Sequence, residues 1–295
     1  MEPSSDGTFN LRRSRRKRIG LILAGVLFLA TIFGIVVLVT LLVDVVVTSL
    51  PWLDAQFISS LPSRKPEEAG IRSALVGSLW LMGLTALISV PLGVASALYL
   101  EEYANDGWFL RLIQVNIANL AGVPSVVYGI LGLALFVRFA AFGNSLLAGA
   151  LTLSLLILPI IIISTQEALR SIPSGIRESA YALGATRWQV IYSHVLPMAA
   201  PGILTGVILA LSRAIGETAP LILVGALTFV PFVPQGALDQ FTALPIQIFN
   251  WTARPQDEFR GLAAAAIVIL MILLFTMNLT AILLRNYFEE RRAGA

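Results

Sequence analysis

Long apolar runs alternate with short polar segments along this chain, which is the pattern of a protein that crosses a membrane several times. About 20 consecutive apolar residues are enough to cross the hydrocarbon core as a helix. Six runs reach roughly this length, and they predict membrane helices over residues 19–43, 73–100, 112–137, 145–164, 201–230 and 261–284. The predicted fold class is therefore all-α: a polytopic membrane protein with six transmembrane helices.

The longest polar interruption, residues 166–200, carries helix signals of its own. Ile176, Ala180 and Leu183 follow Pro173 at helical spacing, so they predict a short amphipathic helix. Such a helix has one apolar face to bury or to offer to a partner.

A second short helix is predicted beyond Gly184, a residue that can take the positive φ with which many helices end. Thr186 and Gln189 have the spacing of a capping box, and Pro197 is expected to end the helix. Its apolar face comprises Trp188, Ile191, Tyr192 and Val195. Residues 166–200 therefore predict two short helices that meet at a sharp angle outside the bilayer and form a docking element.

Composition supports a membrane protein and excludes several functions. The 295 residues are 57% hydrophobic and 13% charged, and the mean hydropathy is +0.85. There is no cysteine, which excludes disulfides, thiolate metal sites and cysteine nucleophiles. The two lysines, Lys17 and Lys65, do not lie in a GxxxxGKS or GxxxxGKT phosphate-binding loop. ATP-driven work would therefore need a partner that carries the ATP site.

The net charge is +3, and the distribution of Lys and Arg predicts the orientation in the membrane. A basic cluster precedes the first apolar run: Arg12, Arg13, Arg15, Arg16, Lys17 and Arg18. If the termini face the same side as residues 101–111 and 166–200, that side holds thirteen of the twenty Lys and Arg residues. The positive-inside rule places it in the cytoplasm. This predicts a cytoplasmic basic tail over 1–18, a transmembrane domain over 19–286 and a cytoplasmic tail over 287–295, with no role in nucleic-acid binding.

Arg213 and Glu217 are charged residues inside the fifth predicted membrane helix. With a rise of about 1.5 Å per residue, a helix that begins near Pro201 places Arg213 roughly 18 Å along its axis, with Glu217 one turn further on the same face. An arginine at that depth costs about 2.5–3.5 kcal/mol on insertion scales, so it is expected to face a partner or a watery cavity. Two interpretations remain open: a structural ion pair, or a path in which Arg213 contacts an anion and Glu217 limits how tightly it is held.

Gly202, Gly206 and Ala210 recur every four residues in the same predicted helix. Small residues at this spacing let two membrane helices approach closely. The sequence leaves open whether this face packs within the chain or against a second subunit.

Several motifs resemble one family of membrane transporters. The motif that resembles the EAA loop of permeases from binding-protein-dependent ABC importers consists of Glu178-Ser179-Ala180, Gly184 and Leu196-Pro197. Ser179 and His194 depart from that pattern, in which alanine and isoleucine are usual. Further segments that resemble phosphate permeases of the PstA type are Glu167 to Arg170, Ala182 to Thr186, Arg213 to Pro220 and Ala121 to Gly129. The resemblance covers residues 72–285.

The resemblance implies a type I ABC importer permease architecture in the bacterial inner membrane, with both termini cytoplasmic. It implies a phosphate permease that works with a second homologous permease, two copies of a cytoplasmic ABC ATPase and an extracytoplasmic phosphate-binding protein. ATP and Mg would be bound by the ATPase, so no cofactor is expected in this chain. Arg213 and Glu217 would line the substrate path. The residues that would couple to the ATPase are Arg170, Glu178, Ala180, Gly184, Arg187, Leu196 and Pro197.

Other functions remain open on the sequence. A permease for another oxyanion, such as sulfate or molybdate, would share the EAA loop. A membrane scaffold that signals phosphate status is a further alternative, although no soluble signalling domain is predicted. A proton-coupled carrier would leave the organised loop unexplained, and an intramembrane enzyme would need paired carboxylates in the spans, whereas the Asp and Glu residues are scattered among loops.

Overall fold

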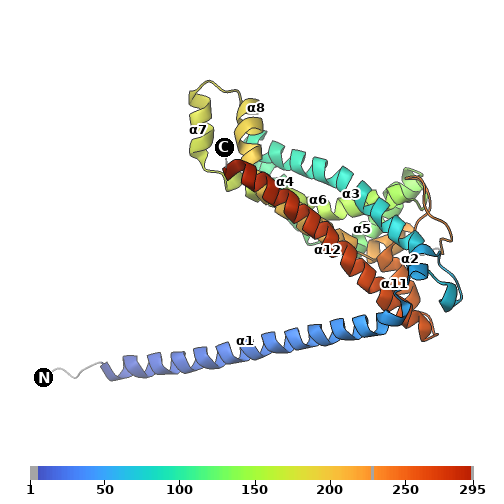
Figure 1. Ribbon diagram of the computed structural model, residues 1–295. Helices are drawn as coiled ribbons and strands as arrows, with labels where there is room; N and C mark the ends of the chain where they lie inside the picture. The colour runs from blue at the N-terminus through green and yellow to red at the C-terminus, as the bar shows by residue number, and fades with distance from the viewer. Residues whose placement is uncertain (1–5, 227–228, 294–295) are drawn as a thin grey trace.

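The computed structural model describes residues 6–226 and 229–293, which form helices and connecting loops with no strand among them (Figure 1). The α-helices, in chain order, are α1 (Asp6–Ser49), α2 (Ala55–Ser59), α3 (Arg72–Leu98), α4 (Trp108–Ala121), α5 (Ser125–Gly132), α6 (Leu146–Arg170), α7 (Ser174–Ala182), α8 (Arg187–Val190), α9 (Leu196–Ile215), α10 (Ala219–Val224), α11 (Leu244–Thr252) and α12 (Glu258–Ala293). Three π-helical turns lie at Tyr99–Tyr103, Leu133–Phe139 and Ile191–Val195, and 3-10 turns lie at Leu50–Trp52 and Pro66–Glu68. The all-α fold class is confirmed.

The predicted membrane segments are present in the described residues. Those that form helices long and apolar enough to cross a membrane are Ile19–Trp52, Arg72–Tyr103, Leu146–Arg170, Arg187–Ile215 and Glu258–Leu283. A further candidate is a bent pair, Trp108–Ala121 followed by Ser125–Phe139, whose halves lie at 103° to each other. Six segments therefore match the six apolar runs when the bent pair is taken as one span.

The break in the third segment lies at Gly122–Pro124, inside the run that predicted an unbroken helix over 112–137. Pro124 has no N–H to donate, and the residue before a proline disfavours the α conformation, so the first half ends there. The Tyr128 hydroxyl donates to the Leu120 carbonyl at 2.8 Å and ties the two halves together across the break. The prediction of a continuous helix is wrong at this position.

The fifth membrane helix begins earlier than the predicted 201–230. It begins at Arg187 as α8 and continues through the π-helical turn into α9. The prediction that Pro197 ends a short helix is wrong because the turn before it is wide: the Leu196 N–H donates to the Ile191 carbonyl, five residues back. Pro197 then stands in the first turn of α9, where a missing N–H leaves no helical hydrogen bond unmade.

Three further boundaries differ from the predictions. After α9 the chain unwinds at Gly216–Thr218 and forms the short α10, so the helix predicted to residue 230 ends at Ile215. The loop predicted over 231–260 contains α11. α12 continues to Ala293, so it includes most of the tail predicted over 287–295.

The helix α6 is the centre of the bundle and packs against α3 and α9. Of its most apolar stretch 67% is buried, against 0% for α1. Small residues permit the close approach of α9: Gly202 faces Ala168, and a side chain on Gly206 would overlap Ser164. Ala210 is fully buried. This small-residue face therefore packs within the chain, which settles the question left open by the sequence.

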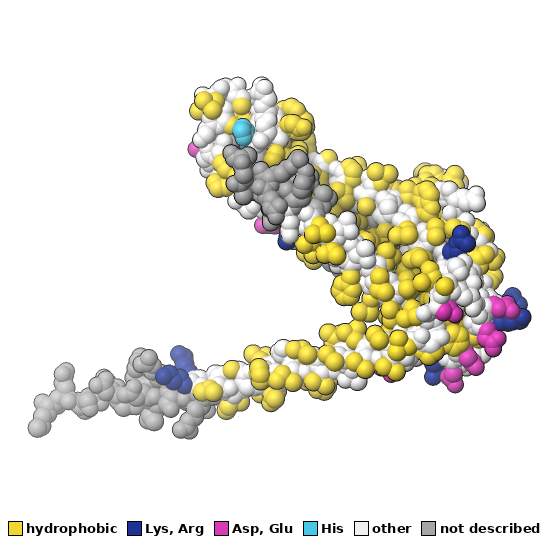
Figure 2. All heavy atoms as spheres, in the orientation of Figure 1, with side chains coloured by type: hydrophobic (Ala, Val, Ile, Leu, Met, Phe, Trp, Pro, Cys, Tyr) yellow, Lys and Arg dark blue, Asp and Glu magenta, His cyan; other side chains and the backbone are white. Residues whose placement is uncertain are grey.

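The helix α1 stands away from the bundle and meets it near the N-terminal end of α12 (Figure 1). Its apolar side chains are exposed along most of its length, and apolar side chains also cover the visible sides of the bundle (Figure 2). Acidic and basic side chains gather at the end that carries α2 and α11 (Figure 2). The helices α7 and α8 and the end of α12 lie together at the opposite end (Figure 1). The charged end and the apolar flanks are those of a membrane-spanning bundle.

Candidate functional site

Arg213 occupies the last turn of α9, and Glu217 lies two residues beyond its end. Arg213 Nε and Glu217 Oε1 are 3.5 Å apart, so the structure brings the predicted pair together. The two residues do not share one helix as predicted, because the chain unwinds at Gly216, whose N–H donates to the Arg213 carbonyl. The side chain of Arg213 is 43% exposed and that of Glu217 is 17% exposed. The guanidinium therefore keeps an open side on which an anion can bind.

The unwound stretch after α9 lies beside the broken third segment. α10 packs against α5, where the absence of a side chain on Gly129 lets Pro220 and Leu223 approach the α5 backbone. Non-helical backbone at membrane depth is tolerated where it is buried in protein or lines a water-filled cavity. Two interrupted helices that meet beside an arginine have the arrangement from which transporters build substrate sites.

The turn between α7 and α8 confirms the helix signals predicted for residues 166–200. Gly184 has a φ of 83°, a conformation that favours glycine. Thr186 Oγ1 accepts a hydrogen bond from the Gln189 N–H at 3.4 Å, and Gln189 Oε1 accepts one from the Thr186 N–H at 2.8 Å. The capping box is therefore present at the start of α8.

Leu183, Trp188 and Tyr192 form an exposed apolar surface on this loop, which we call the loop face. Their exposed fractions are 89%, 59% and 63%, and the two aromatic rings stack with centroids 6.0 Å apart. Ile191 and Val195 were predicted to lie on one apolar face with Trp188 and Tyr192, but both are buried, and Val195 belongs to the apolar core that includes residues of α6 and α9. Exposed aromatic residues are enriched at protein interfaces, so the loop face has the character of a docking surface.

The other predicted coupling residues lie at different depths in the loop. Those that are exposed are Arg170, Glu178, Gly184, Arg187 and Pro197. Ala180 is buried in the apolar core, and Leu196 is half-buried. The guanidinium of Arg187 lies over the ring of Tyr103, 5.6 Å from its centroid, so this arginine reaches back to the end of α3.

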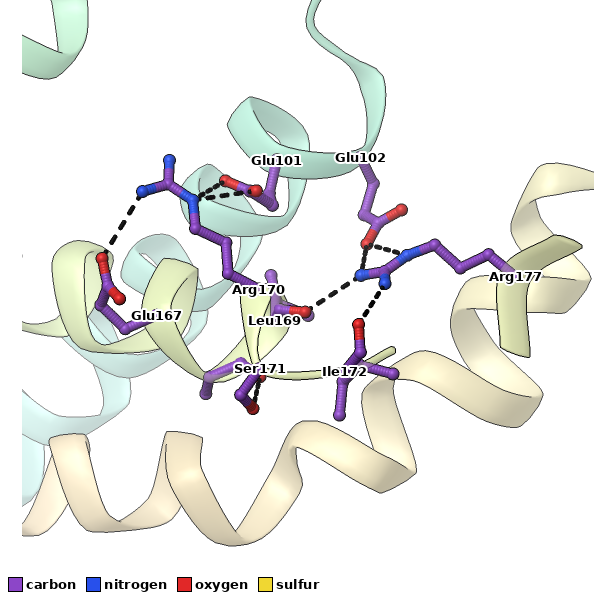
Figure 3. A network of polar contacts seen from close by, with 9 residues as sticks. Glu101, Glu102, Glu167, Leu169, Arg170, Ser171, Ile172 and Arg177 are labelled. Atoms are coloured by element: carbon purple, nitrogen blue, oxygen red, sulfur yellow. Dashed lines mark hydrogen bonds and ion pairs between the residues drawn. The ribbon is translucent and has the colours of Figure 1, made fainter. Parts of the chain in front are cut away.

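Two arginines of this region pair with carboxylates at the end of α3 (Figure 3). Arg170 Nε lies 3.0 Å from both carboxylate oxygens of Glu101, and its Nη1 lies 3.5 Å from Glu167 Oε1. Arg177 Nη2 lies 2.7 Å from Glu102 Oε1. Glu101 and Glu102 lie in residues 101–111, which join two of the predicted membrane helices, and no role was predicted for them. The available signal was an acidic pair at the end of an apolar run, on the same predicted side as a basic loop.

No group of three His, Cys, Asp or Glu side chains within residues 6–226 and 229–293 is arranged to hold a metal ion. The charged groups described above are instead arginine–carboxylate pairs. A guanidinium presents several N–H donors in a plane, which suits carboxylate and phosphate oxygens.

Comparison with known proteins places this geometry among membrane transport components. The family described as binding-protein-dependent transport system inner membrane component matches residues 89–293. The phosphate transport system permease protein PstA of Haemophilus influenzae is 30% identical over 284 residues, which cover 96% of this chain and 98% of that protein. PstA 1 of Mycobacterium tuberculosis is 36% identical over 239 residues, with 79% and 76% covered. The probable ABC transporter permease YqgI of Bacillus subtilis is 31% identical over 255 residues, with 82% and 87% covered.

Solved structures show the same fold at low sequence identity. A chain of a bacterial ABC transporter involved in the import of the acidic polysaccharide alginate aligns with a TM-score of 0.66 and 16% identity, covering 94% of this chain and 99% of that chain. A chain of the MetNI methionine ABC transporter in an inward-facing conformation aligns with a TM-score of 0.57 and 19% identity, covering 74% and 94%. The predicted ABC importer permease architecture is confirmed by these likenesses.

Proposed function

We propose that phosphate is the substrate of this chain, which belongs to the family of binding-protein-dependent transport system inner membrane components and is the permease subunit of an ABC importer. Relatives from Haemophilus influenzae and Mycobacterium tuberculosis carry the name phosphate transport system permease protein, which supports this substrate. The observation that carries the proposal is Arg213, half-exposed at the point where α9 unwinds and held 3.5 Å from Glu217.

In this proposal Arg213 contacts phosphate as it crosses the membrane. The guanidinium fork matches two oxygens of a phosphate, and the bond is charge-assisted. Glu217 neutralises Arg213 when no anion is present and repels an anion that approaches it. A path residue must release its substrate, so a carboxylate that competes for the guanidinium keeps the anion from being held too tightly.

The same proposal assigns the loop face and the predicted coupling residues to a cytoplasmic ATPase. The chain would bind no ATP or Mg itself, and two copies of the ATPase would do so. A second homologous permease would complete the translocation path. A phosphate-binding protein would deliver the anion to the polar end that carries α2 and α11. The exposed apolar surface of α1 would face the lipid bilayer or the second permease.

The proposed orientation places both termini and the loop of residues 166–200 in the cytoplasm of a bacterial cell. Thirteen of the twenty Lys and Arg residues support this orientation. The arrangement of the helices agrees with it, since α7, α8 and the end of α12 share one end of the bundle (Figure 1). ATP binding would move the loop, open the path outward and let hydrolysis return it to the inward-facing state.

The test is phosphate uptake by cells whose only copy of this permease carries Arg213→Ala. We expect uptake to fall by at least about ten-fold, which corresponds to a loss of about 1.4 kcal/mol of interaction, while the ATPase still co-purifies with the complex. Arg213→Lys keeps the charge without the fork and should retain an intermediate rate. Unchanged phosphate uptake in Arg213→Ala would overturn the path assignment. If cells with the wild-type permease took up sulfate or molybdate instead of phosphate, the proposed substrate would be wrong.

A further inference from the structure

Arg177 is the residue by which α7 contacts the end of α3 (Figure 3). Its Nε and Nη2 donate to Glu102 Oε1 at 3.2 and 2.7 Å. Nη1 donates to the Ile172 carbonyl at 3.0 Å, and Nη2 also donates to the Leu169 carbonyl at 3.0 Å. One guanidinium on α7 therefore binds the turn after α3, the last turn of α6 and the linker between α6 and α7.

This contact is stronger than an ordinary surface ion pair. The side chain of Glu102 is 7% exposed and that of Arg177 is 20% exposed. Screening by water is weak at such a site, and four of the five guanidinium N–H donors are used. The Leu169 carbonyl belongs to the last turn of α6, where carbonyls lack helical partners and favour a cation. Removing either partner would leave a largely buried charge unpaired.

The other helix of the loop reaches the same turn. Arg187, which begins α8, lies over the ring of Tyr103, one residue after Glu102. The residues Tyr99–Tyr103 form one π-helical turn at the end of α3. Both α7 and α8 therefore bind this turn through an arginine, one on each side of the Gly184 bend.

Apart from this contact, α7 packs mainly against α8 and the Ile191–Val195 turn, which begin the fifth membrane helix, and its residues Ile176 and Ala180 join the apolar core. Its direct contact with the turn after α3 is made by Arg177. The linker from α6, Ser171–Pro173, lines an open surface hollow of about 500 Å³ together with the two ion pairs. A displacement of α7 is thus transmitted to α3 chiefly by the guanidinium of Arg177.

We propose that the turn Tyr99–Tyr103 receives the movement of the coupling loop and that Glu102 is the positioning residue that fastens α7 to it. The inference rests on the proposed function, because it takes an ATPase as the source of that movement. From this turn the movement passes along α3, which packs against α6 and also contacts α9. The helix α9 carries Arg213 in its last turn, so the route leads from the loop to the proposed anion path, and α7 itself need not contact that path.

The test is made on the complete transporter, with its ATPase and binding protein, reconstituted in proteoliposomes. The measured quantity is the amount of phosphate moved per ATP hydrolysed. In Glu102→Ala we expect this ratio to fall by about ten-fold, within the range found for coupling between linked sites, while ATP hydrolysis and co-purification of the ATPase are retained. A residue that only stabilised the fold would lower the yield of complex and leave the ratio unchanged.

Three further variants make the result specific to the contact. Arg177→Ala should lower the ratio as much as Glu102→Ala, and the double variant should be no worse than either, because both act through one interaction. Asp106→Asn is the matched control, since this exposed carboxylate lies three residues beyond the turn Tyr99–Tyr103 and makes no ion pair with α7; its ratio should stay within about two-fold of wild type. If the Glu102→Ala permease itself cannot be purified as a folded protein, Glu102→Gln, which keeps the size and one acceptor, decides by the same ratio.

An unchanged ratio in an assembled Glu102 variant would overturn the inference, and so would loss of the ATPase from the complex, which would place Glu102 in docking. An additive double variant would overturn it as well. These results differ from failure of the proposed function, in which the wild-type complex itself would not bind an ATPase or move phosphate.

Discussion

Arg213 and Glu217 form an ion pair across the end of a helix, with Arg213 Nε 3.5 Å from Glu217 Oε1 on the non-helical side. The distance is long for a charge-assisted hydrogen bond, which is usually about 2.7–2.9 Å between nitrogen and oxygen. The pair is therefore one that an incoming anion can open. Glu217 holds the guanidinium in place but uses only part of the guanidinium's capacity to donate hydrogen bonds.

Glu217→Gln should make the permease hold phosphate more tightly. The substitution removes the negative charge that competes for Arg213 and repels the anion, so the attraction of the guanidinium is no longer opposed. We expect phosphate binding to the purified permease–ATPase complex, measured by equilibrium dialysis without the binding protein, to strengthen by about ten-fold. Maximal uptake should fall because release becomes slower.

The double variant Arg213→Ala with Glu217→Gln is the control for that experiment. It should lose the gain in affinity, since the guanidinium that makes the contact is gone. Equal phosphate affinities of wild type and Glu217→Gln would show that the carboxylate does not weaken the binding of the anion.

Gly184→Val should uncouple transport from ATP hydrolysis. The φ of 83° at this bend costs a β-branched residue roughly 1–3 kcal/mol, although no neighbouring atom would obstruct its side chain. The angle between α7 and α8 should change as the backbone relaxes, and the loop face with it. We expect less ATPase to co-purify and less phosphate to be moved per ATP.

Gly184→Asn is the matched variant, because asparagine tolerates the left-handed conformation better than valine does. It should keep co-purification and coupling near the wild-type values. Gly184→Glu tests whether a bulky charge at the exposed bend also disturbs docking. Wild-type behaviour of both Gly184→Val and Gly184→Glu would count against a role of this loop in coupling.

Local features of this fold were predictable from the sequence, and contacts between distant residues were not. The capping box at Thr186 and the bend at Gly184 depend on three or four neighbouring residues, and both were predicted correctly. The ion pair between Glu102 and Arg177 joins residues 75 apart and requires the packing of α3 against α6. Sequence spacing carries no information on such a pair.

Prolines account for two of the errors in the predicted helices. Pro124 breaks the third segment, although residues 112–137 around it contain no charged side chain. Pro197 was expected to end a helix, and a π-helical turn before it lets the helix continue. Hydrophobicity alone does not distinguish these cases, because the outcome depends on which backbone N–H groups the neighbouring turns leave without partners. The partner of Arg213 was predicted correctly, yet the unwinding between them at Gly216 was not.

Gly206→Ala should destabilise the contact between α6 and α9. A methyl group at this position would overlap the Ser164 side chain, and overpacking in a close-packed interior costs about 1–3 kcal/mol. We expect the midpoint of thermal unfolding in detergent to fall by several degrees. Ser164→Gly added to Gly206→Ala should recover much of the loss because it removes the overlapping atoms.

Gly34→Ala provides the matched control for the small-residue contact. Gly34 lies on α1, where a side chain would meet no other atom of this chain. Its unfolding midpoint should equal that of wild type or rise slightly, since alanine favours a helix over glycine by about 1 kcal/mol. An equal loss in both variants would show that the effect comes from the change of residue and not from the overlap with Ser164.

Tyr128→Phe removes only the phenolic hydroxyl, and it should loosen the bent third segment. The tyrosine is 6% exposed, and its hydroxyl makes the 2.8 Å bond to the Leu120 carbonyl across the Gly122–Pro124 break. Removing the donor leaves a carbonyl near the break with one partner fewer, which costs about 1–3 kcal/mol when the group is buried. We expect a lower unfolding midpoint and faster hydrogen exchange at the start of α5. Tyr99→Phe, at a site where the side chain is 62% exposed, should leave both quantities unchanged. If Tyr128→Phe exchanges as slowly as wild type, the break is held by the packing of α10 on α5, and the hydroxyl is not required.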